Sequence, residues 1–148
     1  MAINTKKVVI GGLAAGVAMN VIDWLSNGVI LKDRMAADAN AFKPGLGDMM
    51  AQMGGGQVAG YVIMDFVIGM LLVWTYAAMR PRFGPGPRTA SYVALVFWTF
   101  GLIVTMGYMV MGIMSSGLWW TFAFIYLVAL MVSSMVGAAV YTEETSTA

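Results

Sequence analysis

Four long apolar stretches dominate the sequence and leave few folds open to it. They cover residues 8–31, 57–79, 90–112 and 118–141. Each is about 23 residues long, enough for a helix rising about 1.5 Å per residue to cross a hydrocarbon core of about 30 Å. A backbone inside a bilayer must satisfy its own hydrogen bonds, so we expect each stretch to be a helix. The sequence therefore predicts an all-α integral membrane four-helix bundle, with residues 1–148 forming a single domain and residues 32–56 its longest loop.

Composition supports a membrane protein and argues against several functions. Hydrophobic residues make up 60% of the chain and charged residues 10%, whereas a soluble domain has about 25% charged residues. The sequence has no Cys and no His, which removes thiolate ligands, the commonest metal ligand and the commonest general base. Its fifteen methionines could ligate copper(I), but without His or Cys we interpret them as ordinary apolar residues. We expect no metal site, no cofactor, no enzymatic activity and, at a net charge of +1, no binding of nucleic acid.

The basic residues predict how the chain is oriented. Lys6, Lys7 and three arginines in residues 80–88 share one side of the membrane, and the 32–56 loop, with three basic residues, lies on the other. Because Lys and Arg in short loops favour the cytoplasm, we expect both termini in the cytoplasm and residues 32–56 outside. Residues 80–88 include Pro81, Pro85 and Pro87, which we expect to end the second helix and form a tight linker. The basic start and apolar run also resemble a signal peptide, but the run extends well past the small residues near Ala18.

One side of the first stretch carries small and polar residues. At about 100° per residue, they fall within an arc of roughly 80°: Gly12, Gly16, Asn20, Asp23 and Asn27. The second stretch has a similar stripe that includes Tyr61 and Asp65. Since the two helices run in opposite directions, both acids reach a similar depth, about 5 Å from the membrane centre on the outer side. We predict a shared polar or cation site formed by Asn20, Asp23, Asn27, Tyr61 and Asp65.

Three interpretations of the two acids remain open. An unpaired carboxylate inside a membrane is costly, and the spans contain no Lys or Arg to neutralise it. The acids could be protonated and hold the first two helices together, could bind a proton or cation used in transport, or could recognise a partner or ligand. Glycines in small-residue positions predict close helix packing, within the bundle or in a dimer: Gly12, Gly16, Gly56, Gly60, Gly101 and Gly137.

The last stretch carries a loose resemblance to a known group of proteins. It has an aromatic-Leu-Val core at residues 126–128 and a small-residue end at residues 136–138. In this, and in its longer first loop, the chain resembles small four-span bacterial inner-membrane proteins of unknown function. The resemblance implies the architecture and a multi-pass location in the cell inner membrane, and it carries no activity.

The leading functional prediction is a structural or accessory membrane protein. It would be embedded in the lipid bilayer and would self-associate as a homo-oligomer or join other membrane subunits. The alternative is a small proton- or cation-coupled carrier or channel-like protein that uses Asp23 and Asp65. A hydrophobic enzyme acting on lipids or quinones lacks any nucleophile–base pair.

Overall fold

Every regular element in the computed structural model is a helix, across residues 3–52 and 54–143, which are the residues that the structure describes. The elements in chain order are α1 (Thr5–Asp23), the π-helix η1 (Trp24–Ile30), α2 (Lys32–Phe42), α3 (Leu46–Ala51), α4 (Gly55–Phe83), α5 (Pro87–Val110) and α6 (Ser116–Val140). Within the described residues, four helices are long and apolar enough to cross a membrane: Thr5–Ile30, α4, α5 and α6. The prediction of an all-helical chain with four helices of membrane length is confirmed.

The second long helix does not end where its proline predicted. α4 continues through Pro81 to Phe83. Proline lacks the backbone N–H that would bond to the carbonyl four residues earlier, but only one hydrogen bond is lost and only one short turn remains beyond it. Gly84 then ends the helix with a positive φ of 84°, and its N–H donates to the Arg80 carbonyl at 2.8 Å. Pro87 occupies the first turn of α5, where a missing N–H has no cost.

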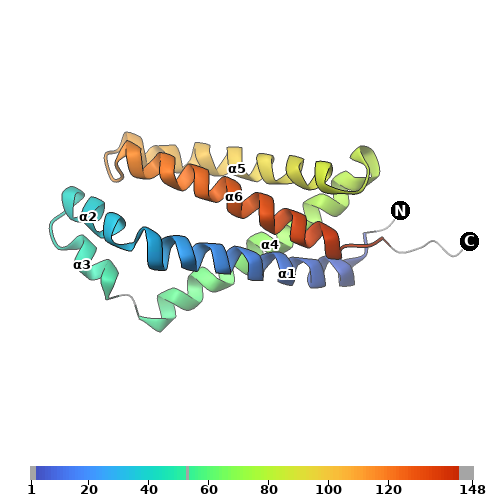
Figure 1. Cartoon of the computed structure of the whole chain (residues 1–148), viewed down its shortest axis with the longest axis horizontal. Helices are drawn as coiled ribbons and strands as arrows, with labels where there is room; N and C mark the ends of the chain where they lie inside the picture. The colour runs from blue at the N-terminus through green and yellow to red at the C-terminus, as the bar shows by residue number, and fades with distance from the viewer. Residues whose placement is uncertain (1–2, 53, 144–148) are drawn as a thin grey trace, which may run out of the picture.

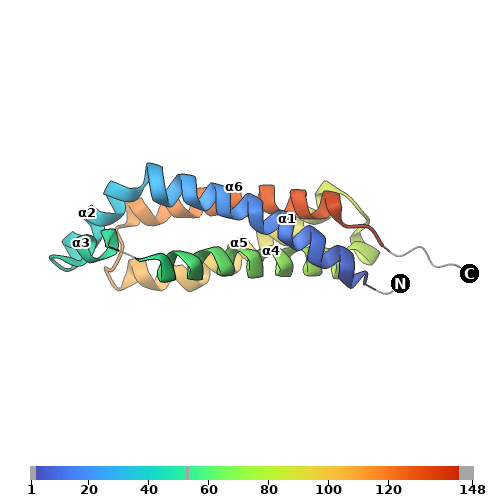
Figure 2. The same ribbon diagram turned by 90° about the horizontal axis from the view of Figure 1, so that it is seen from below.

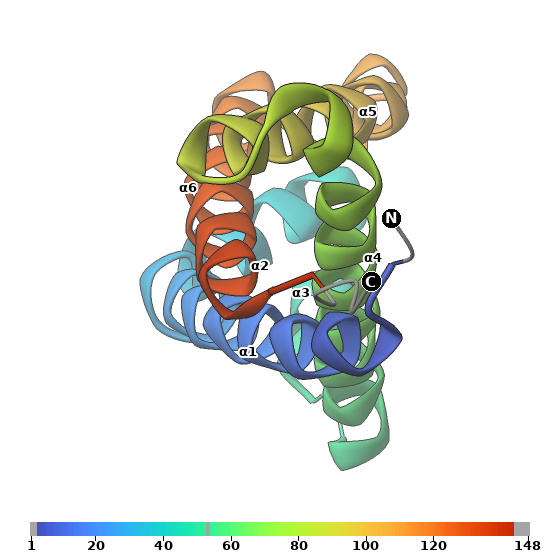
Figure 3. The ribbon, with the colours of Figure 1, turned by 90° about the vertical axis from the view of Figure 1, so that its right-hand side faces the viewer.

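The four long helices form a bundle in which each lies beside two others. Seen end-on, α1, α4, α5 and α6 follow one another around the bundle (Figure 3). Seen from the side, α1 and α6 form one layer and α4 and α5 the other (Figure 2). We call the end where α1 begins and α6 finishes the terminal end, and the opposite end, which carries the short helices, the α2–α3 end (Figure 1).

In α4 and α5 the buried residues are confined to the half near the terminal end, whereas α6 stays buried at the α2–α3 end through Leu118, Trp119 and Ala123. In α4 the buried residues begin at Asp65, and in α5 they stop at Ala94. The fully buried Leu72, Val73 and Val93 all lie in the terminal half. Toward the α2–α3 end, α4 diverges from α5 (Figure 1). The accessibility of the two acids predicted to form a site therefore depends on where they lie relative to this change in packing.

The α2–α3 end is tied to the bundle through α6. The backbone N–H of Ser115 donates to Asp38 Oδ2 at 2.7 Å, and Arg34 Nη1 donates to Thr121 Oγ1 at 3.2 Å. These contacts hold the short helices over α6 and leave the first turns of α4 uncovered.

Candidate functional site

The candidate site lies beside a close crossing of α1 and α4 that is formed by glycines. A Cβ at Gly69 would lie 2.6 Å from the Gly16 nitrogen and 2.9 Å from the Gly16 Cα. A Cβ at Gly12 would lie 2.8 Å from the Met70 Cα. Real Cβ atoms essentially never approach other atoms this closely, so the two backbones touch only because side chains are absent.

Asn20 adds a polar link between the same two helices, one turn further toward the α2–α3 end. Its Nδ2 donates to the Gly16 carbonyl at 2.9 Å and to the Val62 carbonyl of α4 at 3.4 Å. The first of these bonds is within α1, and the second joins the helices. Asn20 therefore has the helix-joining role that was one of the possibilities for the acids.

The two acids lie just beyond this crossing. Asp65 is 3% exposed and is the first buried residue of α4, one turn from Gly69. Asp23 is partly buried and is the last residue of α1. The two carboxyls lie close enough for their charges to interact. Counting residues from the membrane centre placed these two groups at one depth, and the structure also brings them together.

Tyr126 of α6 belongs to the same group of side chains, although it was not among the predicted site residues. Its phenol lies within electrostatic range of both carboxyls and of the phenol of Tyr61. The signal in the sequence was its position at helical spacing from Trp119, Ser133 and Gly137. Those three residues are all buried in the structure, so the stripe they define faces the bundle.

The carboxyls have no hydrogen-bonding or cationic partner in the part of the chain that the structure describes. No side-chain hydrogen bond in residues 3–52 and 54–143 involves the carboxyl of Asp23 or Asp65. The Lys and Arg residues of the long helices all lie at the terminal end, several turns away: Lys6, Lys7, Arg80, Arg82 and Arg88. A pair of buried acids without such partners can accept a proton or a small cation.

The two other predicted site residues lie differently from the expectation. The expectation for Asn27 assumes that regular α-helical spacing continues past Asp23. Asn27 instead lies in η1, where hydrogen bonds span five residues, as in the bond from Leu31 N–H to the Ser26 carbonyl at 2.7 Å. The wider π-helical turn shifts every later side chain relative to that stripe. Asn27 remains partly buried. Tyr61 is exposed and sits one turn from Asp65, on the part of α4 that leaves the bundle.

The glycines predicted to pack helices divide into two groups. Gly12 and Gly16 face α4, and a Cβ at Gly137 would lie 3.2 Å from the Ala15 Cβ and 3.3 Å from the Gly11 carbonyl oxygen. At Gly56, Gly60 and Gly101, in contrast, no atom of the described chain lies within 4 Å of a Cβ. Those three glycines therefore make no close helix contact within residues 3–52 and 54–143. Gly69, which the prediction omitted, is the centre of the crossing.

A shallow groove runs between α1 and α4 on the outside of the bundle. It has a volume of about 350 Å³ and is lined by Val17, Asn20, Val21, Trp24, Val62 and Phe66. Apart from Asn20 its lining is apolar, so it is suited to lipid chains rather than to a polar substrate.

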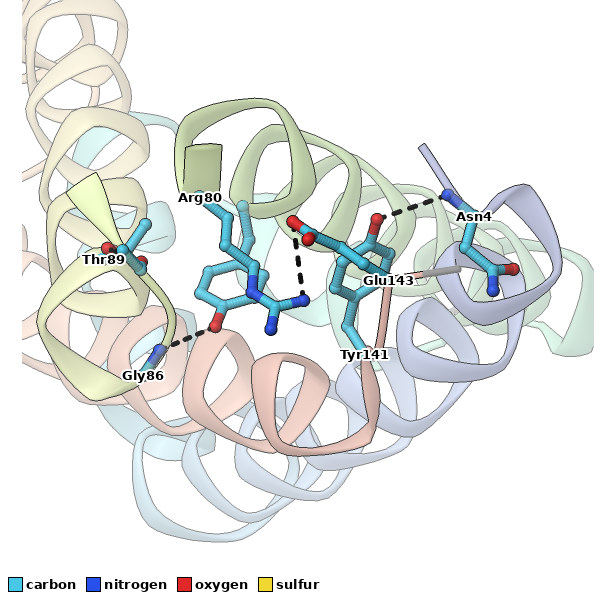
Figure 4. A network of polar contacts seen from close by, with 8 residues as sticks. Asn4, Arg80, Gly86, Thr89, Tyr141 and Glu143 are labelled. Carbon is cyan, nitrogen blue, oxygen red and sulfur yellow. Dashed lines mark hydrogen bonds and ion pairs between the residues drawn. The ribbon is translucent and has the colours of Figure 1, made fainter. Parts of the chain in front are cut away.

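A second polar cluster closes the terminal end (Figure 4). Arg80 Nη1 lies 3.6 Å from Glu143 Oε1, and the guanidinium lies 5.8 Å from the centre of the Tyr141 ring. The Tyr141 hydroxyl accepts from the Asn4 N–H at 3.3 Å. Tyr76 meets Tyr141 edge to face at 6.0 Å, and its hydroxyl accepts from the Gly86 N–H at 2.9 Å. These residues come from α4, from the turn before α5, and from the segments flanking α1 and α6.

Comparisons with known proteins give no match: no family model, no curated protein and no solved structure matches the chain.

Proposed function

We propose that this multi-pass helical protein binds and releases a proton or a small monovalent cation at Asp23 and Asp65, as a carrier or channel-like protein. The observation that carries the proposal is Asp65, an acid 3% exposed beside a second acid, with no hydrogen-bond partner or nearby cationic side chain in the described residues. Ionisable groups inside membrane spans are costly and mark ion or proton pathways.

The other interpretation of the acids, as a link between helices, has less support. Gly12, Gly16 and Gly69 already bring α1 and α4 into backbone contact, and Asn20 supplies the hydrogen bond between them. The acids lie beyond that crossing and make no hydrogen bond that would join the helices.

The ligand set favours a proton or a singly charged cation. Two carboxyls and the Tyr126 phenol lie within electrostatic range of one another here, and no group of three or more acidic, His or Cys side chains occurs in the described residues. Ca²⁺ takes 6–8 oxygen ligands and Mg²⁺ requires octahedral geometry. Two acids can instead share one proton, because placing two negative charges side by side is unfavourable.

We further propose that the membrane is a bacterial inner membrane with the terminal end in the cytoplasm. Five basic residues lie at or near the terminal end, in the first turn of α1 and at the linked ends of α4 and α5. The α2–α3 end has three basic residues, accompanied by Asp33, Asp38 and Asp48. This asymmetry supports the positive end as cytoplasmic.

The test is proton or cation flux through protein reconstituted in liposomes that contain a pH-sensitive dye. We expect flux above that of protein-free liposomes, and its loss in Asp65→Asn and Asp23→Asn, which keep the side-chain volume and remove the ionisable group. Asp33→Asn, an exposed acid in the first turn of α2, is the matched control and should retain the flux. Equal flux in the wild type and in the double variant, with Na⁺ and K⁺ gradients as well as a pH gradient, would refute the proposal.

A second candidate is a structural or accessory subunit that self-associates. It is favoured by the uncovered first turns of α4, where residues 55–64 are all exposed and no atom of the described residues lies within 4 Å of a Cβ at Gly56 or Gly60. A second copy could pack its own glycines there, since small residues allow close helix approach in lipid.

Because the sequence has no cysteine, Gly60→Cys introduces a single thiol, and disulfide formation in membranes would report such a dimer. Trp74→Cys, exposed in the terminal half of the same helix, is the control. Equal cross-linking at both positions would contradict a specific interface.

A further inference from the structure

The acid pair lies at the boundary between the two kinds of packing in the bundle. On the side of the α2–α3 end, no residue of α4 before Asp65 and no residue of α5 after Ala94 is buried. On the terminal side, the glycine crossing begins one turn from Asp65 and is followed by the fully buried Leu72 and Val73. The two sides of the acid pair therefore differ in how easily water could reach it.

The terminal side is closed twice. The glycine crossing is the first barrier, and the cluster of Asn4, Tyr76, Arg80, Tyr141 and Glu143, which we call the terminal latch, is the second. Ser133 of α6, which touches Met19 between Gly16 and Asp23, is fully buried, and among the described residues its hydroxyl has one hydrogen-bond partner, the Met19 sulfur at 3.8 Å. Between the crossing and the terminal latch lies Val73 of α4, which is fully buried and packs against Gly11 and Gly137. No described polar group in this layer offers a path for a hydrated ion.

The terminal latch is built from contacts that can separate without unfolding a helix. The Arg80–Glu143 pair is partly exposed, with 21% and 20% of the two side chains accessible, and its 3.6 Å separation is longer than a hydrogen bond. Arg80 Nη1 is otherwise without a partner in the described residues. Tyr141, 4% exposed, follows the end of α6 in extended backbone, and Glu143 lies beyond it outside any helix, so both can move while α6 keeps its own hydrogen bonds.

We propose that the structure shows the acid pair open to the α2–α3 end and closed to the terminal end, with the terminal latch acting as the gate on the closed side. This inference rests on the proposed function, because a gate has meaning only if the acids exchange a proton or cation. In this proposal water reaches the pair from the α2–α3 end past Tyr61 and through the partly buried Asp23, since Asp65 itself is 3% exposed, and it stops at the glycine crossing. Opening the terminal latch, separating the helices at the glycine crossing and tightening the α2–α3 end would expose the same acids to the other side.

The entrance can be tested with single thiols, because the sequence contains no cysteine. Tyr61→Cys replaces a residue on the side of α4 that faces Tyr126, and Ile63→Cys a residue about 160° away around the helix. The two native side chains are similarly exposed, at 57% and 63%. A charged methanethiosulfonate reagent reacts only with a thiol in contact with water. Added on the α2–α3 side of a bilayer, it should modify Tyr61→Cys and leave Ile63→Cys, which faces lipid, unmodified.

The gate is tested with Val73→Cys, which places a thiol at a fully buried position between the two barriers. In the otherwise native chain this thiol should be unreactive to reagent added on either side. Adding Arg80→Gln and Tyr141→Phe, which remove the ion pair and one hydroxyl, should make it at least tenfold more reactive from the terminal side only. The matched control is Arg88→Gln with Tyr92→Phe, an Arg–Tyr pair within α5 alone, with Arg88 Nε donating to Tyr92 at 2.8 Å. The control should leave Val73→Cys unreactive.

The outcomes separate this inference from the proposed function. If Tyr61→Cys and Ile63→Cys react equally, or if the terminal latch variants leave Val73→Cys and a second buried reporter of α4, Ala77→Cys, as unreactive as the control does, the gate is refuted. The flux measurements with Asp23→Asn and Asp65→Asn then still test the transport proposal, independently of the gate. If flux is absent but both thiol results hold, the access geometry is right and the transport proposal is wrong. Circular dichroism of each variant confirms that the helices are retained.

Discussion

The glycine crossing between α1 and α4 makes a quantitative prediction for Gly69→Ala. The added Cβ would lie 2.5 Å from the Gly12 carbonyl oxygen and 2.6 Å from the Gly16 nitrogen, whereas ordinary van der Waals contact begins at 3.4 Å. These neighbouring atoms are all backbone, so no side chain can move aside. The helices must separate locally by about 0.9 Å, the difference between 3.4 Å and the shortest of these distances. Overpacking of this kind costs about 1–3 kcal/mol.

The comparison that isolates this cost is Gly60→Ala in the same helix. Among the described residues, no atom lies within 4 Å of a Cβ at Gly60, so the substitution only improves helix propensity, by up to about 1 kcal/mol. Gly69→Ala gains the same propensity, and the difference between the two variants is the packing cost alone. We therefore expect Gly69→Ala to be less stable than Gly60→Ala by about 1–3 kcal/mol.

The measurement is reversible unfolding in mixed micelles with increasing dodecyl sulfate, followed by tryptophan fluorescence and circular dichroism. Both variants should retain the helical content of the wild type before the transition. If Gly69→Ala is as stable as Gly60→Ala or more stable, then α1 and α4 are not in backbone contact at this position, and the placement of the acids beside a closed crossing would be wrong.

Three further substitutions test other contacts of the site and bundle. Asn20→Leu removes the amide that reaches the Val62 carbonyl and should lower the free energy of unfolding by about 0.6–2 kcal/mol in the same assay, with proton flux retained. Trp98→Phe removes the 2.7 Å bond from the indole N–H to the Ala123 carbonyl and should cost about 1 kcal/mol; an unchanged transition would show that α5 and α6 do not need it. Tyr126→Phe keeps the ring and removes the hydroxyl near both acids, so the liposome flux should fall while stability changes little; full flux would place Tyr126 outside the site.

The fold could be predicted from the sequence because its dominant signal is length and hydropathy. The bilayer requires helices of about 20 residues, and the four apolar stretches meet that requirement one by one. The end of α4 was missed because one proline near a helix end costs a single hydrogen bond, which the chain can lose. The propensity of an isolated residue says little about whether one more turn forms beyond it.

The site could be predicted only in part. The relation between Asp23 and Asp65 is set by depth in two antiparallel helices, which residue counting can estimate. Tyr126 and Gly69 depend instead on how α6 and α4 are rotated about their axes, and that rotation is set by packing against all the neighbours. Asn27 was misplaced because nothing in its local sequence signals that the helix widens after Asp23.

The π-helix η1 also has a consequence for sequence change within this protein. A π-helical segment holds more residues per turn than an α-helix, so it can absorb a change in chain length without rotating the next helix. Here it lies between Asp23, which faces the other acid, and α2, which Asp38 fastens to the start of α6. Removing one residue from Trp24–Ile30 should convert the segment toward an ordinary α-helix. Asp23 should then stay beside Asp65, and Asp38 should keep its hydrogen bond at the start of α6. The same deletion within Thr5–Asp23 would turn the glycines and the acid away from α4.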